Sequence, residues 1–363
     1  MRTVSVRTAR EYEVLIGEGL LEELPERLQR VCLSDRVCII TDDLVENLFL
    51  TSLERNLKDA GFEVSSYTFP HGEQSKNLQT LSDILEFLAA RHFRRNDTVI
   101  ALGGGVVGDT AGFAASVYMR GISFVQIPTT LLSAVDASVG GKTAVDLQGG
   151  KNLAGTFWQP SLVLCDTKII KHLPIPIFNE GMAEVIKCNV IRDLPIICRI
   201  EEGSVSAHLE EIIYDCVTLK KDIVEDDERD IKGIRNILNA GHTIGHAIEA
   251  LSGYTVSHGH AVGTGLMVES QMAFRLGLCE RETVDRIAKA VNVYGLKTPL
   301  LWSAEQLTGA MRKDKKNRDD LITFEFPLAI GTCKETKLSR EKTICLLEDT
   351  IRPNNTPVKG HRR

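Results

Sequence analysis

The sequence predicts an α/β N-terminal domain with a parallel, Rossmann-like sheet, followed by a mainly α-helical C-terminal domain. In the first half, short apolar runs alternate with amphipathic stretches, which is the pattern of βαβ units. From about Ile177 onward, helical periodicity replaces this alternation. We therefore expect two domains, residues 1–172 and 173–363. They would join near Leu173-Pro-Ile-Pro176, because proline interrupts both a helix and a strand ladder.

The predicted sheet rests on short runs that are apolar throughout, as in strands covered on both faces. One amphipathic stretch between them, Ser52–Ala60, predicts a helix. The predicted buried strands are Arg36–Thr41, Thr98–Leu102, Phe124–Pro128 and Leu162–Cys165.

The second half shows apolar residues at helical spacing over most of its length. A single apolar run, Leu321–Phe326, predicts a short strand near its end. The predicted helices are Glu180–Ile191, Val205–Val224, Arg235–Leu251, His260–Leu276 and Glu280–Tyr294.

Composition excludes several classes of protein. The 363 residues carry 43 Lys and Arg against 49 Asp and Glu, a formal net charge of −6, whereas a nucleic-acid-binding surface is usually basic. We expect no membrane span and no signal peptide, because no uncharged apolar run is long enough and the first residues alternate with charges. The nine cysteines include no C-x-x-C pair, so we expect reduced thiols in a cytoplasmic protein.

A glycine-rich turn follows the predicted strand Thr98–Leu102. The segment Gly103-Gly-Gly-Val-Val-Gly108-Asp109 contains G-x-G-x-x-G before an apparent helix, where backbone N–H groups could approach a pyrophosphate. No acid stands about 20 residues further on, where a dinucleotide site usually has one for the ribose. Asp42, just past the strand Arg36–Thr41, offers a substitute carboxylate.

Two lysines lie in further glycine-rich turns. Ser138-Val-Gly-Gly-Lys142-Thr143 resembles a nucleotide P-loop, but Asp136 occupies the position of the first glycine, which argues against an ATPase. Lys142 can still bind a phosphate. Lys151-Asn152 follows in a second Gly-Gly turn, and either lysine can also be an ordinary solvated turn residue.

The segment Arg235-Asn-Ile-Leu-Asn239-Ala-Gly-His242-Thr-Ile-Gly-His246-Ala-Ile-Glu249 carries the strongest local signal. If it is one helix, Arg235, Asn239, His242, His246 and Glu249 share one wholly polar stripe at spacings of 4, 3, 4 and 3 residues. Histidines at i and i+4 beside Arg and Asn point to a functional site rather than to two structural histidines. The glycines in this segment suggest close approach by a ligand or another element.

Two nearby segments could complete a metal site. Glu180-Gly-Met-Ala-Glu184-Val-Ile-Lys187 places Glu184 and Lys187 on one helix face, and Ser257-His258-Gly-His260 adds two histidines. Two histidines and one carboxylate leave a position open, as a catalytic zinc requires. Spacing does not select the ligands among the four histidines at 242, 246, 258 and 260, and a hydrogen-bonded cluster without metal remains the alternative.

Cations recur beside these Gly-, Asn- and His-rich motifs. Together they point to a small substrate with two anionic groups, such as a phosphate and a carboxylate. They are Lys142, Lys187, Lys221, Arg235 and Lys315.

Taken in order, these motifs resemble the 3-dehydroquinate synthase family over nearly the whole chain. The N-terminal ones are Pro70-His-Gly-Glu-Gln-Ser-Lys76, Gly103–Asp109, Tyr118-Met-Arg-Gly121, Pro128-Thr-Thr-Leu-Leu132, Asp136–Lys142, Gly150-Lys-Asn152 and Phe157-Trp-Gln-Pro160. The C-terminal ones are Ala183-Glu-Val-Ile-Lys187, Asn239–Glu249, His258-Gly259 and Asp314-Lys-Lys316.

The resemblance implies specific roles for these residues. It implies zinc, or cobalt, held by Glu184, His242 and His258, with His246 contacting the substrate phosphate instead. It implies substrate or catalytic roles for Arg120, Asp136, Lys142, Asn152, Lys187, Lys221, Arg235, Asn239 and Lys315, with Arg120 reaching the partner's site in a homodimer. It implies NAD contacts from Asp42, Glu73, Lys76, Gly104, Gly105, Val106, Asp109, Thr129, Thr130, Lys142 and Lys151.

The reaction implied is that of the shikimate pathway, which leads to aromatic amino acids. The family converts 3-deoxy-D-arabino-heptulosonate 7-phosphate to 3-dehydroquinate and phosphate, with NAD reduced and then reoxidised. Three positions depart from the family's usual residues, namely His172, Ala240 and Cys188-Asn189, and none removes a catalytic group. The alternatives are another sugar-phosphate cyclase, a metal-dependent polyol dehydrogenase, whose uncharged substrates would not need these cations, and a catalytically silent binding module.

Overall fold

The computed structural model describes residues 1–194, 197–311 and 321–351, which form two compact units. The first unit comprises Met1–Cys188 and Cys198–Arg235, and the second comprises Asn189–Ile197 and the chain from Asn236 onward. The division into functional domains at residues 172 and 173 stays a prediction.

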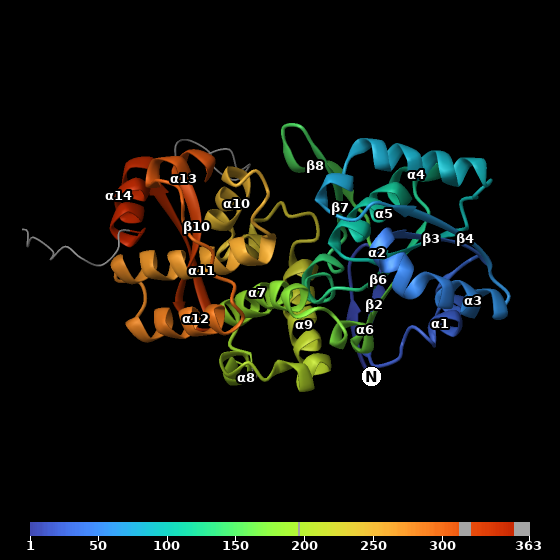
Figure 1. The fold of residues 1–363 in the computed structure, drawn as a ribbon, viewed down its shortest axis with the longest axis horizontal. Helices are drawn as coiled ribbons and strands as arrows, with labels where there is room; N and C mark the ends of the chain where they lie inside the picture. The colour runs from blue at the N-terminus through green and yellow to red at the C-terminus, as the bar shows by residue number, and fades with distance from the viewer. Residues whose placement is uncertain (195–196, 312–320, 352–363) are drawn as a thin grey trace, which may run out of the picture. The chain divides into compact units, whose positions relative to one another are not determined.

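A seven-stranded sheet forms the centre of the first unit (Figure 1). Its order is β1-β2-β9-β6-β5-β3-β4, and every neighbouring pair is parallel except the antiparallel edge pair β1–β2. The strands are β1 Arg2–Val6, β2 Tyr12–Gly17, β3 Arg36–Asp42, β4 Glu63–Phe69, β5 Thr98–Gly103, β6 Ser123–Pro128 and β9 Leu162–Asp166. This confirms the predicted Rossmann-like sheet.

Each central strand is apolar on both faces because helices cover both faces. In β3, Cys38 and Ile40 pack into one core, while Val37 and Ile39 pack into another on the opposite face. Helices α4 (Leu78–Ala90) and α5 (Gly105–Val117) supply the first core, and α1 (Leu24–Val31) and α3 (Thr51–Asp59) supply the second. The two-residue alternation of the strands therefore feeds two hydrophobic layers.

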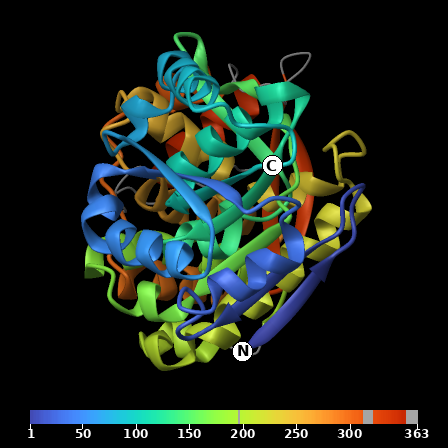
Figure 2. The same ribbon diagram turned by 90° about the vertical axis from the view of Figure 1, so that its right-hand side faces the viewer.

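The remaining elements of this unit lie around the sheet. Figure 2 shows α9 in yellow-green beside the dark blue edge strands β1 and β2. These remaining elements include α6 Thr167–Lys171, α9 Leu209–Asp226, β7 Lys142–Leu147, β8 Gly150–Phe157 and all but the end of α7 Ile175–Ile191. The short ones are α2 Asp43–Val45, α8 Ile197–Glu202, η1 Glu46–Leu50, η2 Glu73–Ser75, η3 Tyr118–Arg120, η4 Ser133–Ala137 and η5 Val205–His208.

In its described residues, the second unit is mainly helical, as predicted, and contains one β-hairpin (Figure 1). Its core joins Ile244, Ala261 and Met272 from the helices to Phe324 and Phe326 from the hairpin. The elements are α10 His242–Leu251, α11 His258–Arg275, α12 Arg281–Val293, α13 Ala304–Met311, β10 Leu321–Ala329, β11 Thr332–Ser339 and α14 Arg340–Ile351.

The single helix predicted over Arg235–Leu251 is wrong. The chain forms a short 3₁₀ segment, η6 (Ile234–Asn239), and then the separate helix α10. Gly241 has φ of 78° and ψ of −16°, a left-handed conformation that ends one helical segment and precedes the next. Of the predicted polar stripe, only His242, His246 and Glu249 therefore share one helix.

Two expectations from composition concern the cysteines and the helices. All nine cysteines are free thiols. Among the described residues, none of the helices has the length and apolar character that crossing a membrane requires.

Candidate metal and substrate site

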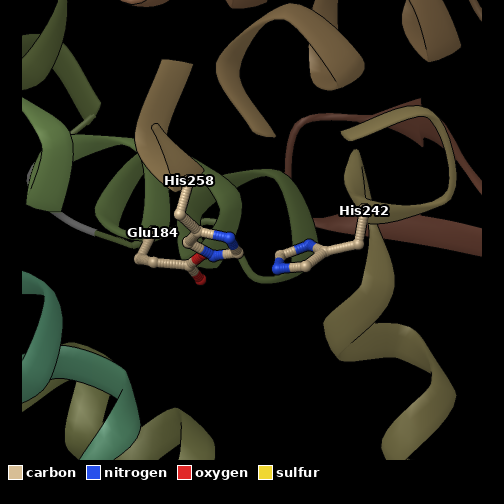
Figure 3. A group of neighbouring side chains, drawn as sticks. All are labelled: Glu184, His242 and His258. Carbon is tan, nitrogen blue, oxygen red and sulfur yellow. The ribbon is translucent and has the colours of Figure 1, made fainter. Parts of the chain in front are cut away.

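Three side chains that come from α7, α10 and α11 converge in Figure 3. Glu184, His242 and His258 each offer one ligand atom, and these atoms all lie within 4.8 Å of one another. Glu184 is fully buried, His242 is 8% exposed and His258 is half-buried. Two imidazoles and one carboxylate form the donor set of an open zinc site, with a fourth position left for water or substrate.

The two imidazoles are held by hydrogen bonds on their Nδ1 atoms. His242 Nδ1 lies 3.2 Å from the carbonyl oxygen of Ala240, and His258 Nδ1 lies 3.4 Å from Oε2 of the buried Glu249. Because a carbonyl or an ionised carboxylate only accepts, both Nδ1 atoms carry the proton. Each Nε2 atom then carries the lone pair that can bind a metal ion. A hydrogen bond from the other ring nitrogen to a carbonyl or carboxylate oxygen is typical of metal-bound histidine.

The other two candidate histidines lie outside this group of three. His246 is one turn further along α10 and exposed, with its ring centroid 5.3 Å from that of His242 and 6.5 Å from that of His258. His260 Nδ1 lies 2.9 Å from the Ser257 hydroxyl. The grouping of His242 with His258 is the one that the family resemblance implies.

In the first unit, the partly buried Asp136 forms a charge cluster with the buried Glu184, Lys187 and Lys220. Helix α7 approaches the start of η4 closely at Gly181, where a Cβ atom would lie 2.6 Å from the backbone nitrogen of Leu132. This close approach brings Lys187, which contacts Glu184 on its own helix, to 3.6 Å from Asp136 Oδ2. Lys220 of α9 contacts Asp136 at its carboxylate and, at 2.6 Å, at its carbonyl oxygen.

Electrostatics within this cluster shift three pKa values. Burial acts to raise the pKa of Asp136, but Lys187 and Lys220 outweigh it and lower that pKa to about 2. Burial opposes the charge of Lys187 too, yet Asp136 and Glu184 raise its pKa above the usual range. Burial lowers the pKa of Lys220. The cluster is therefore a network in which each charge depends on its neighbours.

The lowered pKa of Asp136 predicts a loss of stability in acid. Because the folded-state pKa lies below that of the unfolded chain, the contribution is complete above about pH 4 and disappears toward pH 2. Asp136→Asn should therefore lower the free energy of unfolding at pH 7 by on the order of 2 kcal/mol. Urea unfolding at several pH values should show that the free energies of unfolding of the variant and the wild type approach each other below pH 4. A free-energy difference between the two proteins that stays constant from pH 7 to pH 3 would contradict the lowered pKa of Asp136.

The neighbouring lysines of α9 have different surroundings. Lys220 is 8% exposed and contacts Asp136, whereas Lys221 is partly exposed and pairs with Glu225 at 3.1 Å and Asp222 at 3.3 Å. The role predicted for Lys221 stays a prediction. Lys220, which the sequence reasoning missed, is the lysine that lies beside Asp136 and Lys187.

The other predicted substrate residues occupy varied positions. Arg235 is 3% exposed and donates to the carbonyl oxygens of Glu228 and Gly140. Lys142 is exposed and pairs with Asp230 at 2.7 Å. Asn239 is half-buried and donates to the Asn236 carbonyl oxygen. Lys315 lies outside the described residues.

The glycine-rich turn lies where the strand order reverses. The chain runs from β3 to β4 on one side and then places β5 on the other side of β3, so the carboxyl ends of β3 and β5 are adjacent. Asp42 ends β3, and the turn Gly103–Gly105 joins β5 to α5. Open α/β sheets bind ligands at such a reversal, and the N-terminus of α5 offers backbone N–H groups there.

Several predicted cofactor residues surround this turn. The N–H of Thr129 donates to Gly103 O at 3.0 Å, and the Thr130 side chain would lie 3.3 Å from a Cβ placed on Gly104. Val106 and Asp109 lie on α5 and are half-buried. The Asp42 Oδ1 atom accepts from the N–H groups of Leu44 and Val45. This predicted ribose contact therefore also caps α2.

Lys76 connects predicted cofactor and substrate residues. Its Nζ atom is 2.6 Å from Asp109 Oδ2 and 2.6 Å from Asn152 Oδ1, and the residue is 5% exposed. The neighbouring pair Lys151 and Glu73 has its charged atoms 3.2 Å apart. Burial works against the charge of Lys76, but Asp109 raises its pKa. This arrangement fixes the β7–β8 hairpin beside the first turn of α5.

Arg120 lies apart from the residues above, on η3. It is exposed and has φ of 67°, and the preceding Met119 has φ of 51°. Such backbone strain at two consecutive non-glycine residues is uncommon and often marks a functional turn.

The two halves of the known family match this chain in order. The model of the 3-dehydroquinate synthase N-terminal region matches residues 66–180, and that of the C-terminal region matches residues 181–317. A 3-dehydroquinate synthase of Clostridium acetobutylicum is 38% identical over 94% of this chain and 98% of its own length. One from Enterococcus faecalis is 42% identical over 94% of this chain and 96% of its own.

The fold has relatives among sugar-phosphate cyclases. The structure of a 2-deoxy-scyllo-inosose synthase, complexed with carbaglucose-6-phosphate, NAD⁺ and Co²⁺, superposes with a TM-score of 0.87 at 25% identity. The match covers 96% of this chain and all of that one. With both family regions matched in order and relatives aligned over almost their full length, this chain belongs to the 3-dehydroquinate synthase family.

Proposed function

We propose that this enzyme converts 3-deoxy-D-arabino-heptulosonate 7-phosphate to 3-dehydroquinate and phosphate, using NAD and a divalent metal ion, zinc or cobalt. The observation that carries the proposal is the convergence of Glu184, His242 and His258 in a chain of this family. Hydride transfer from a substrate alcohol to NAD is assisted by a metal that acidifies the hydroxyl group, and this donor set is suited to such a metal.

The metal would be held by Glu184 and by Nε2 of His242 and His258. Glu249 and the Ala240 carbonyl oxygen support this assignment, because they fix the proton on each Nδ1 and orient the rings. When bound, zinc supplies Lewis-acid polarisation of substrate hydroxyls.

NAD would bind at the turn between β5 and α5. Its pyrophosphate would meet the N-terminus of α5 at Gly104, Gly105 and Val106, and its ribose would meet Asp42 at the end of β3. The other proposed NAD contacts are Glu73, Lys76, Asp109, Thr129, Thr130, Lys142 and Lys151. NAD supplies a hydride acceptor that is regenerated within the same cycle.

The substrate carries a phosphate and a carboxylate, and the proposed contacts are mainly cations and amides. Arg235 is fixed by two carbonyl oxygens, and Asn152 is fixed by Lys76, so both present oriented donors without further ordering. We propose Lys187 and Lys220 as additional cations for the developing negative charge. The remaining proposed contacts are Asp136, Lys142, Lys221, Asn239, His246 and Lys315.

We further propose that the enzyme is a homodimer. Arg120 would then act in the site of the partner subunit, which accounts for an exposed arginine in a strained turn. A cytoplasmic location and the absence of nucleic-acid partners remain predictions from composition.

A panel of sugar phosphates tests the proposed substrate. Purified protein with NAD and Zn²⁺ or Co²⁺ should release phosphate from the heptulosonate 7-phosphate, and at least a hundredfold more slowly from glucose 6-phosphate or sedoheptulose 7-phosphate. Phosphate release that is faster from either of the other two sugars would assign the chain to another cyclase reaction. No release from any of the three, in a sample that binds both cofactors, would refute a cyclase.

A further inference from the structure

The peptide between Ala240 and Gly241 is hydrogen-bonded on both of its faces. Its carbonyl oxygen accepts from His242 Nδ1 at 3.2 Å, and its N–H donates to Oε2 of Glu269 at 2.7 Å. The C=O and N–H of one trans peptide point in opposite directions. The Glu269 carboxylate, the peptide and the His242 ring therefore form one chain of hydrogen bonds that ends at an imidazole with Nε2 left as an acceptor.

Glu269 also holds the first turn of the helix that His242 begins. Its Oε1 atom accepts from the Ile244 N–H at 3.2 Å, and the Thr243 N–H contributes as well. The N-cap residue of α10 is Gly241, which has no side chain with which to cap the helix. A carboxylate from a different helix thus binds N–H groups on both sides of His242.

Close contact between α10 and α11 makes this reach possible. A Cβ atom on Gly265 of α11 would lie 1.9 Å from the Gly241 carbonyl oxygen, and one on Gly241 would lie 2.6 Å from Leu266 Cγ. Glu269 follows Gly265 by one helical turn, so its side chain meets the start of α10. Helix α11 begins with His258, so it carries one proposed ligand and supports the other.

Capping alone does not account for this glutamate. Glu269 is 1% exposed, and burial raises its pKa to about 8 despite the N–H groups that it accepts from. Burying an ionisable glutamate costs free energy of folding, whereas a Ser or Asn at the N-cap would cap a surface helix at little cost. Among its described contacts, the peptide that orients His242 distinguishes Glu269 from an ordinary cap.

From these contacts we infer that Glu269 is a positioning residue for His242, acting through the Ala240–Gly241 peptide to fix the ring that presents Nε2 to a metal ion. The inference rests on the proposed metal site. Glu249 does the same for His258 by direct contact, so each histidine has its own buried glutamate.

Glu269→Gln tests this role with little change in shape. The amide retains one acceptor oxygen but turns an NH₂ group toward a backbone N–H. The variant should therefore bind Co²⁺ about ten- to a hundredfold more weakly in chelator competition. Its Co²⁺ d–d absorption should also change in wavelength or intensity. Met272→Ala is the matched control, because Met272 is fully buried in the same helix and its loss removes core contacts only. That control should lose thermal stability and keep the wild-type Co²⁺ affinity and spectrum.

Glu269→Gln with wild-type Co²⁺ affinity and spectrum would overturn the inference and leave the metal site intact. A wild-type protein that fails to bind Co²⁺ would instead refute the proposed metal site itself. If Glu269→Gln does not fold, the tautomer of His242 in the metal-free wild type tests the inference instead. NMR measures this tautomer from the chemical shifts of the imidazole nitrogens. A proton on Nδ1 supports the inference, and a proton on Nε2 overturns it.

Discussion

Replacing His242 with alanine should abolish stoichiometric zinc binding and reduce turnover by about a thousandfold or more, since Lewis-acid catalysis contributes several kcal/mol. The ring is 8% exposed and offers one of the three ligand atoms of the group that Glu184, His242 and His258 form. Metal content by elemental analysis and the rate of phosphate release give the two measurements.

His246→Ala is the matched control for that variant. His246 lies on the same helix one turn later, is exposed, and is outside the group formed by Glu184, His242 and His258. The variant should retain full metal content, and its KM for the phosphorylated substrate should rise about tenfold or more, because a charge-assisted phosphate contact is lost. Loss of the metal from His246→Ala, or its retention in His242→Ala, would show that the ligand set is different.

The adjacent lysines of α9 give the second large effect. Lys220→Met should lower kcat/KM by about a hundredfold or more, because the cation in contact with Asp136 is removed from the buried charge cluster. Lys221→Met should lower kcat/KM less, by about tenfold, because this proposed substrate contact is partly exposed and already paired with Glu225 and Asp222. Steady-state kinetics of phosphate release compare the two.

Folding must be checked for Lys220→Met, because loss of one partner from a buried ionic network commonly destabilises a protein by about 3–5 kcal/mol. Circular dichroism and NAD binding by fluorescence serve this purpose. A folded Lys220→Met with normal kinetics would refute the role proposed for Lys220 and leave the role predicted for Lys221.

The central strands β3, β5, β6 and β9 could be predicted from the sequence because they have a strong physical signature, whereas the outer strands β1, β2 and β4 were not predicted. A strand such as β5 is buried on both faces and reads as a continuous apolar run that ends at glycine. Helices α11 and α12 of the second unit could also be predicted, since their apolar residues recur at helical spacing. Helices α13 and α14 were not predicted.

The break before α10 could not be predicted from periodicity. The polar residues of this segment fit a helical stripe, and two glycines lower helix propensity without fixing where a helix ends. The left-handed conformation of Gly241 is stabilised by tertiary contacts, namely Glu269 and the closely packed α11. These contacts come from residues that are distant in sequence.

The burial of Lys220 had a signal that the sequence reasoning did not use. Buried positions of α9 include Ile213, Cys216, Val217, Lys220 and Val224, which recur at helical spacing. A lysine on this stripe must face the interior, while Lys221 falls beside it. The buried glutamates at 249 and 269 had no comparable signal for their roles, because their partners lie on other segments.

The most direct test of the account follows phosphate and NADH together in one reaction with substoichiometric NAD, bound metal and the heptulosonate 7-phosphate. The account predicts one phosphate for each substrate consumed, over many turnovers per NAD, with no accumulation of NADH absorbance. NADH that accumulates in proportion to substrate consumed, without phosphate release, would contradict it and indicate a metal-dependent dehydrogenase instead.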